Sequence, residues 1–226
     1  MEHSDRQSYE VQIRELFERD CASRAEIDRL NKAYIRNLEA AGAELIMERA
    51  EILDRNTVRL ASGRKITARY ILVATGAAPF IPRHLPGHEL AISSNEAFHL
   101  EKLPRRICIV GGGYIAVEFA GIFHGLGVET ILIYRGEKIL RGFDEDLQDH
   151  LSAEMQKKGI EVRTRSDVSK IEKSGDGVRI TLEDGAVFGA GHVMFATGRL
   201  PNVVNLGLEN AGVDLTPHYA VKVDAY

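Results

Sequence analysis

The residues best suited to chemistry form a glycine-rich turn near the middle of the chain. Three glycines, Gly111, Gly112 and Gly113, follow the short apolar segment 107–110, which is typical of a buried strand. Gly111 allows a tight turn, and Gly113 leaves no Cβ between the backbone and a pyrophosphate. The helix expected next has a small residue, Ala116, near its start. Its first turn offers free N–H groups to phosphates. The spacing predicts a dinucleotide-binding site, with an unliganded tight turn as the alternative.

Two arginines stand just after the strand that should follow that helix. Arg135 comes directly after Tyr134, and Arg141 lies six residues further on. Guanidinium groups hold phosphates through forked, charge-assisted hydrogen bonds, so the pair favours the 2′-phosphate of NADPH. An acidic residue here would instead favour NADH, but Glu137 lies three residues beyond the strand. The alternative is a solvated basic loop that binds nothing.

Two residues at the start of the helix have a structural and a functional interpretation. Tyr114 is either a core residue or a cover over the nicotinamide pocket. Glu118 is either a carboxylate stabilised by the helix dipole or a partner near the nicotinamide. Their positions alone leave both alternatives open.

An internal repeat supplies the remaining candidates. Two meanders each lead into an apolar segment that ends in Ala-Thr-Gly, at residues 74–76 and 196–198. A glycine at the end of a strand lets the backbone approach a flat cofactor closely. We therefore regard Thr75, Gly76, Thr197 and Gly198 as candidate cofactor-binding residues.

The hydrophobic pattern predicts an α/β chain. A helical stretch over 9–41, with a possible break near Cys21 because Ser23 and Glu26 resemble a capping box, precedes short strands. A β-α-β-α-β run over 106–163 predicts a Rossmann-like parallel sheet, and a three-stranded antiparallel meander over 168–188 follows it. Outside that run we expect a short helix at 94–100 and short strands at 44–47, 51–53, 57–60, 64–67, 70–73 and 220–223.

Composition excludes several classes of protein. Lys and Arg number 29 and Asp and Glu 33, a net charge of −4, so we expect neither a nucleic-acid partner nor a membrane-surface one. The two cysteines, Cys21 and Cys108, form no disulfide framework, and no apolar run is long enough to span a membrane. The polar first residues lack a signal sequence, so we expect a cytoplasmic protein.

At this point a resemblance is recognisable. The run 111–121, with Arg135, Arg141 and the pair Phe143-Asp144, resembles the glutathione reductases, the NADPH-dependent, FAD-containing branch of the pyridine nucleotide-disulfide oxidoreductases. Residues 197–202 also resemble the motif by which such chains return to the flavin side. The resemblance implies an NADPH site with Gly112, Ile115, Glu118 and Gly198, a 2′-phosphate site with Arg135 and Arg141, Tyr114 as an aromatic gate over the flavin, and Gly76 beside the flavin.

Departures from that pattern limit what the resemblance implies for function. The chain has no N-terminal G-x-G-x-x-G for FAD, no C-x-x-x-x-C, and no counterpart of the family's interface domain with its His-Glu pair. We therefore expect a partial FAD-binding remnant (1–76), an NADPH-binding domain (77–198) and a return segment (199–226). The chain alone should bind NADPH, hold FAD weakly or not at all, and be unable to reduce glutathione disulfide, while its parent protein would be a homodimer.

Other functions are also compatible with the sequence. A related NADPH-dependent reductase, such as a trypanothione or mercuric reductase, would differ mainly outside this sequence, whereas the two arginines disfavour an NAD-using dihydrolipoyl type. A non-catalytic NADPH-binding module, or a flavoenzyme whose remaining part is a separate chain, is the further possibility.

Overall fold

The computed structural model describes residues 20–224 of the 226. The chain divides into two compact units. The first unit comprises Met1–Thr75 and Val203–Tyr226, and the second unit comprises Gly76–Asn202. Within the described residues, no helix is long and apolar enough to cross a membrane.

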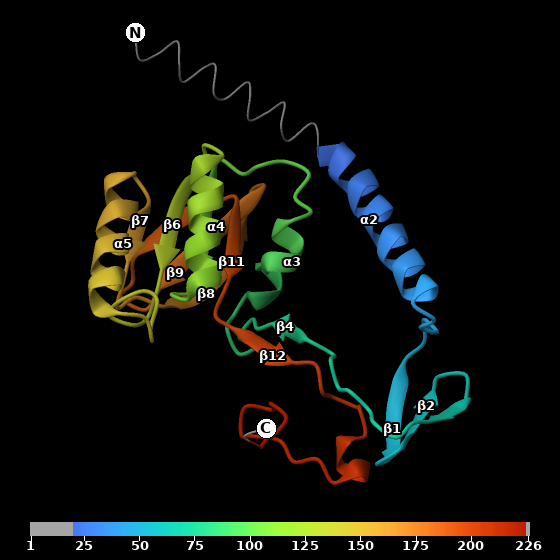
Figure 1. Cartoon of the computed structure of the whole chain (residues 1–226). Coiled ribbons are helices and arrows are strands. Elements are labelled where there is room, and N and C mark those ends of the chain that lie inside the picture. The colour runs from blue at the N-terminus through green and yellow to red at the C-terminus, as the bar shows by residue number, and fades with distance from the viewer. Residues whose placement is uncertain (1–19, 225–226) are drawn as a thin grey trace. The chain divides into compact units, whose positions relative to one another are not determined.

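A four-stranded parallel sheet forms the centre of the second unit (Figure 1). Its strands, in spatial order, are β11 (His192–Phe195), β5 (Arg106–Val110), β6 (Glu129–Ile133) and β7 (Glu161–Arg163). Helix α4 (Tyr114–Gly125) connects β5 to β6, and helix α5 (Glu145–Lys157) connects β6 to β7. The expected β-α-β-α-β run and its parallel sheet are therefore confirmed.

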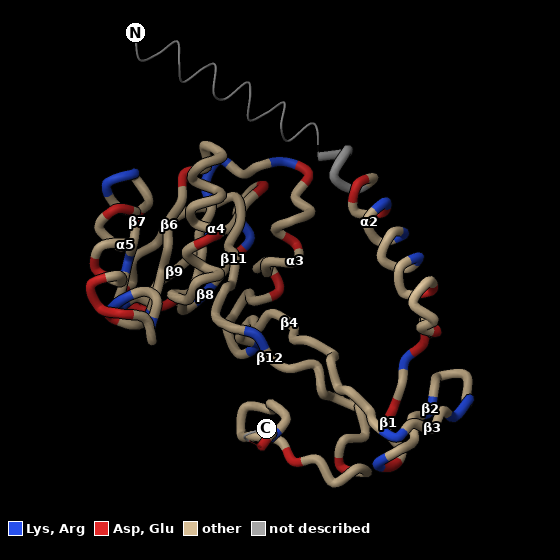
Figure 2. The backbone as a smooth tube through the Cα atoms, viewed as in Figure 1, with Lys and Arg blue, Asp and Glu red and all other residues tan. Residues whose placement is uncertain are grey.

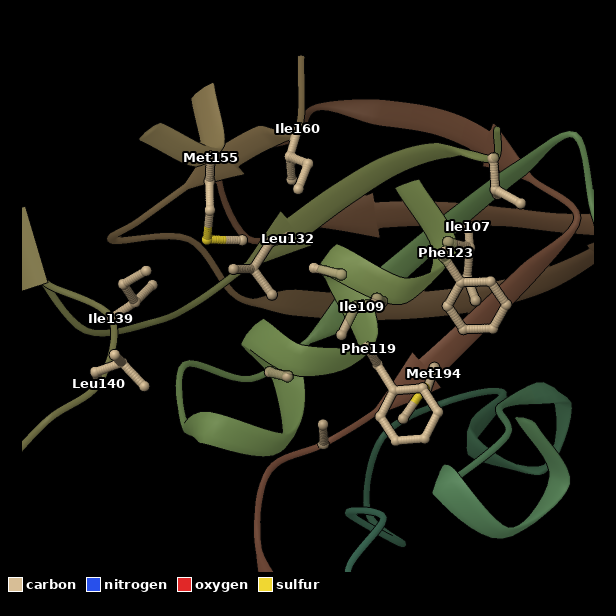
Figure 3. Close-up of a cluster of buried hydrophobic side chains, with 14 residues drawn as sticks. Ile107, Ile109, Phe119, Phe123, Leu132, Ile139, Leu140, Met155, Ile160 and Met194 are labelled. Atoms are coloured by element: carbon tan, nitrogen blue, oxygen red, sulfur yellow. The ribbon is translucent and has the colours of Figure 1, made fainter. Parts of the chain in front are cut away.

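The central strands β5 and β6 are buried on both faces, which explains their nearly continuous apolar sequences. Ile107 and Ile109 of β5 pack with Phe119 and Phe123 of α4 in one hydrophobic cluster (Figure 3). The small side chain of Ala116 is buried in the same cluster. Cys108 and Val110 of β5 belong to a second cluster on the opposite face. Alternate side chains of one strand thus supply the two halves of the core.

An antiparallel meander contributes to the second of these clusters. It consists of β8 (Val168–Ser174), β9 (Gly177–Leu182) and β10 (Val187–Ala190), paired in the order β10-β9-β8. Ile171, Ile180 and Leu182 are almost completely buried in it. The predicted three-stranded meander, and with it the predicted α/β fold class, is confirmed.

Two short strands bring the chain into and out of the second unit side by side. Strand β4 (Ala77–Pro79) pairs antiparallel with β12 (Arg199–Pro201). Next to this ribbon, the N–H of Asn202 donates to the carbonyl of Gly76 (2.9 Å). Between β4 and β5 lie the short helices η1 (His88–Leu90) and α3 (Ser94–Ala97).

In the described part of the chain, the first unit buries far fewer apolar side chains than the second unit. Helix α2 (Asp20–Ala40) leads to the meander β1 (Ala50–Asp54), β2 (Thr57–Leu60) and β3 (Lys65–Thr67), and the one-turn helix η2 (Leu208–Ala211) follows later. Its cluster of buried residues contains Ile52, Val203, Leu206 and Leu208. The N–H of Ile52 donates to the carbonyl of Leu206 (2.8 Å), so β1 is held to the chain's last segment. Basic and acidic residues are interspersed along α2 (Figure 2).

Several expectations for the first unit are wrong. Residues 44–47 and 70–73 form no strand, because no neighbouring strand pairs with them in the described part of the chain. Helix α2 runs without a break through positions 21 and 23, so the expected break near Cys21 is not found. Residues 220–223 form only an isolated bridge between Val221 and Leu215. The helical prediction for 9–19 lies outside the described residues.

A capping box at α3 makes stability depend on pH. The N–H and the hydroxyl of Ser93 both donate to Glu96 Oε2 (2.7 and 2.5 Å), and these bonds lower the pKa of the Glu96 carboxyl. A carboxyl whose pKa is lower in the folded state than in the unfolded state contributes stability that is fully present above the unfolded pKa of about 4.3. This contribution is lost as the pH falls through the pKa of the folded state. We expect Glu96→Gln to lower the urea midpoint at pH 6, and the gap from wild type to narrow toward pH 3.5. An equal gap at both pH values would contradict this account.

Candidate dinucleotide-binding site

A cavity of about 450 Å³ opens at the carboxyl ends of the central strands of the second unit. The chain proceeds from β5 to β6 on one side and returns to β11 on the other, so this edge is the topological switch point where α/β sheets bind ligands. Nine of the twelve candidate residues line this one cavity, namely Gly111, Gly112, Gly113, Tyr114, Ile115, Arg135, Arg141, Thr197 and Gly198.

The glycine bend, defined here as residues 111–113, is crowded by backbone groups at its first residue. Gly111 has a φ of +146°, and a Cβ on it would lie 2.8 Å from the carbonyl carbon of Ala196. Its N–H donates to the carbonyl of Ile133 (2.8 Å). The bend is therefore in contact with the ends of β6 and β11 simultaneously, at a position that only glycine can occupy.

Gly113 differs from Gly111 in its surroundings. It is the N-cap of α4 with an extended backbone (φ −86°, ψ 177°), and no atom lies within 4 Å of where its Cβ would be. The first N–H groups of α4 have no side-chain cap from this residue. The open space and the free donors lie beside the cavity, which suits an anionic ligand.

The arginine loop, residues 135–141, carries four charged side chains with different surroundings. Glu137 is paired with Arg165, and Lys138 with Asp149 (2.9 Å) and Glu145 (3.6 Å). Arg135 and Arg141 are exposed and line the cavity, and neither forms a hydrogen bond or ion pair within the described part of the chain. Two unneutralised guanidinium groups therefore face the cavity together.

The other candidates are placed unequally. Tyr114 is exposed at the cavity, and Thr197 hydrogen-bonds through its hydroxyl to the carbonyl of Phe80 (2.9 Å). Glu118 is exposed one turn along α4 and does not line the cavity. Thr75 and Gly76 also lie outside its lining.

Sequence reasoning missed part of the lining. Tyr134 lies between the glycine bend and the arginine loop, and its place at the strand end before Arg135 could have indicated it. Val110, Ile133 and Phe195 end the strands β5, β6 and β11, Ala196 follows β11, and Val168 begins β8. The other missed residues come from connections without a periodic pattern: Phe80, Pro82, His84, Leu85, Asp167 and Glu183. Nothing in their spacing points to the cavity.

Neither thiol chemistry nor a metal is indicated by the described residues. Cys108 is completely buried in β5, and burial raises the pKa of its thiol, which makes it a poor nucleophile. Among residues 20–224, no group of three or more His, Cys, Asp or Glu side chains could hold a metal ion.

The geometry defines the class first: the second unit is a Rossmann-type α/β unit with a cavity at the carboxyl edge of its parallel sheet. A family model described as pyridine nucleotide-disulphide oxidoreductase matches residues 2–226, so the chain belongs to that family. Glutathione reductase of Burkholderia cepacia is 45% identical over 205 residues, covering 91% of this chain and 45% of that protein. Trypanothione reductase of Trypanosoma congolense is 38% identical over 218 residues, covering 91% of this chain and 44% of that protein.

A solved structure agrees with these relatives. The HOCl-induced flavoprotein disulfide reductase of Escherichia coli matches with a TM-score of 0.81 and 26% identity, over 88% of this chain and 46% of that one. The chain thus spans less than half the length of the curated relatives and of the solved structure to which it is similar.

The two glycines should respond differently to a methyl group. Gly111→Ala forces a Cβ against Ala196 at an unfavourable φ, so we expect a loss of at least about 2 kcal/mol in unfolding free energy. Gly113→Ala meets open space, so we expect a change within about 1 kcal/mol, the cost of a poorer N-cap. Urea unfolding of both variants tests the contrast, and equal losses would contradict the crowding at Gly111.

Proposed function

We propose that this chain binds NADPH in the cavity of the second unit, as the NADPH-binding part of a glutathione-disulfide reductase-like flavoprotein. The observation that supports this most strongly is the pair of unneutralised arginines, Arg135 and Arg141, on the same cavity as the glycine bend. A 2′-phosphate carries the charge and the acceptor oxygens that two guanidinium groups bind.

The residues present fit the cofactor. The glycine bend and the first N–H groups of α4 would hold the pyrophosphate, and Arg135 and Arg141 the 2′-phosphate. Tyr114, Ile115, Thr197 and Gly198 would line the remaining length of the cofactor. When bound, NADPH supplies a hydride.

Selection of NADPH over NADH follows from the pairing within the arginine loop. An NADH site needs a free acidic group for the ribose hydroxyls. Glu137 is the acidic residue of the loop, and its carboxylate is engaged by Arg165. We therefore assign the loop to phosphate recognition.

The remaining parts of the proposal concern the whole protein. We assign NADPH binding to residues 77–198 and the flavin side to residues 1–76 and 199–226, including Thr75 and Gly76. In the parent protein, electrons would pass from NADPH through FAD to glutathione disulfide, in a homodimer. The trypanothione reductase relative, 38% identical, makes trypanothione disulfide the second candidate substrate. Cytoplasmic residence stays a prediction.

Binding measurements test the central claim. Calorimetric titration of wild type should show tighter binding of NADPH than of NADH. Arg135→Ala and Arg141→Ala should each lose about 1.5–3 kcal/mol of NADPH binding free energy and little for NADH, because NADH lacks the 2′-phosphate.

Arg105→Ala is the matched control for that titration. Arg105 is exposed just before β5, at the opposite edge of the sheet from the cavity, and removing it changes the net charge equally. Its NADPH affinity should equal that of wild type. Equal losses of NADPH affinity in all three variants would show that only the net charge of the protein matters, and would contradict a specific role of Arg135 and Arg141. Equal binding of NADPH and NADH to wild type would refute the proposal.

Turnover is expected to be absent from this chain alone. Its sequence has neither a C-x-x-x-x-C pair nor a second glycine motif of the FAD type at its start, and Cys108 is buried. Purified protein should therefore be colourless and should not oxidise NADPH in the presence of glutathione disulfide. A stoichiometric flavin spectrum, or disulfide-dependent loss of absorbance at 340 nm, would contradict this.

A further inference from the structure

The ring of Tyr134 occupies a space that two glycines leave open. A Cβ on Gly112 would lie 2.5 Å from Cδ1 of the ring, and a Cβ on Gly136 would lie 2.5 Å from Cε1. Real Cβ atoms do not approach so closely, so both neighbours must be glycine while the ring is there. One side chain therefore lies against the glycine bend and the start of the arginine loop together.

Backbone hydrogen bonds continue the same connection. The N–H of Leu140 donates to the carbonyl of Gly112 (2.5 Å), which joins the far end of the loop to the bend. On the other side, Arg165 N–H donates to the carbonyl of Gly136 (2.8 Å), and Ser166 N–H to that of Tyr134 (3.1 Å). The loop is thus held at both of its ends.

Burial and strain indicate that this loop conformation is imposed. Ile139 and Leu140 are almost completely buried in a hydrophobic cluster (Figure 3). Tyr134 packs against the same cluster. Leu140 has a φ of +57°, an unfavourable value for a leucine that persists only where the surroundings enforce it. The residue next to it is Arg141, so the strained position sets where that guanidinium starts.

We propose that Tyr134 is the positioning residue of the arginine loop: its ring holds residues 135–141 at the glycine bend, so that Arg135 and Arg141 face one cavity. The effect on NADPH binding rests on the proposed function, whereas the holding of the loop by the ring does not. A loop that is already ordered loses less conformational entropy when a phosphate binds, so the ring contributes to preference for NADPH over NADH without touching the phosphate.

The first measurement needs no nucleotide. Amide hydrogen exchange of residues 136–141 in the full chain should be at least about tenfold faster in Tyr134→Ala than in wild type. Tyr134→Phe keeps the ring and should restore protection. Tyr70→Ala, which removes an exposed tyrosine of the first unit, should leave exchange in these residues unchanged.

The second measurement uses the crowding itself. Gly136→Ala alone should destabilise the chain, because its Cβ meets the ring. In the Tyr134→Ala background the same substitution should cost much less, since the space is vacated. Additive effects would show that the ring and Gly136 do not share that space and would overturn the proposal.

The third measurement connects the loop to the ligand. Tyr134→Ala should weaken NADPH binding about tenfold and NADH binding less than twofold, with recovery in Tyr134→Phe. If wild type binds NADPH and Tyr134→Ala binds it equally well with unchanged exchange, the positioning role is wrong. If wild type binds no NADPH but Tyr134→Ala still frees the loop, the proposed function fails and the positioning role stands.

Discussion

The close approach of backbone at the glycine bend is the constraint on which the site depends. At Gly111 the chain passes so near the carbonyl of Ala196 that no side chain fits, and its N–H is bonded to Ile133. The bend follows β5, the strand between β11 and β6, so it contacts the ends of both neighbours. Crowding on one side and open space at Gly113 on the other turn a strand-to-helix connection into one wall of a cavity.

The charge of the cavity follows from pairing rather than from composition. The chain as a whole is slightly acidic, and the arginine loop contains an acid as well as bases. Glu137 and Lys138 each form an ion pair with a residue outside the loop. Arg135 and Arg141 form none in the described part of the chain, and both line the cavity. Two guanidinium groups thus line the cavity of a protein whose net charge is negative, together with the carboxylates of Asp167 and Glu183.

The second unit was predictable because its signals are local and repeated. Strands such as β5 are apolar on both faces, α4 begins at a glycine motif, and the arginines stand directly after β6. Residues 70–73 show the limit: their apolar composition predicts a strand, but a strand also needs a neighbour, which composition cannot supply. Phe80, Asp167 and Glu183 reach the cavity from connections whose course is set by tertiary packing, so no spacing could identify them.

The two units differ in how completely they bury apolar side chains, and this bears on where binding resides. The second unit has two clusters that cover both faces of its sheet, whereas in the first unit the cluster has four buried members among the described residues and leaves Tyr34 and Leu72 exposed (66% and 89%). Every residue that lines the cavity belongs to the second unit. The ordering of the glycine bend, Tyr134 and the two arginines is therefore sustained by the better-packed unit, and it does not draw on the weaker core of the first.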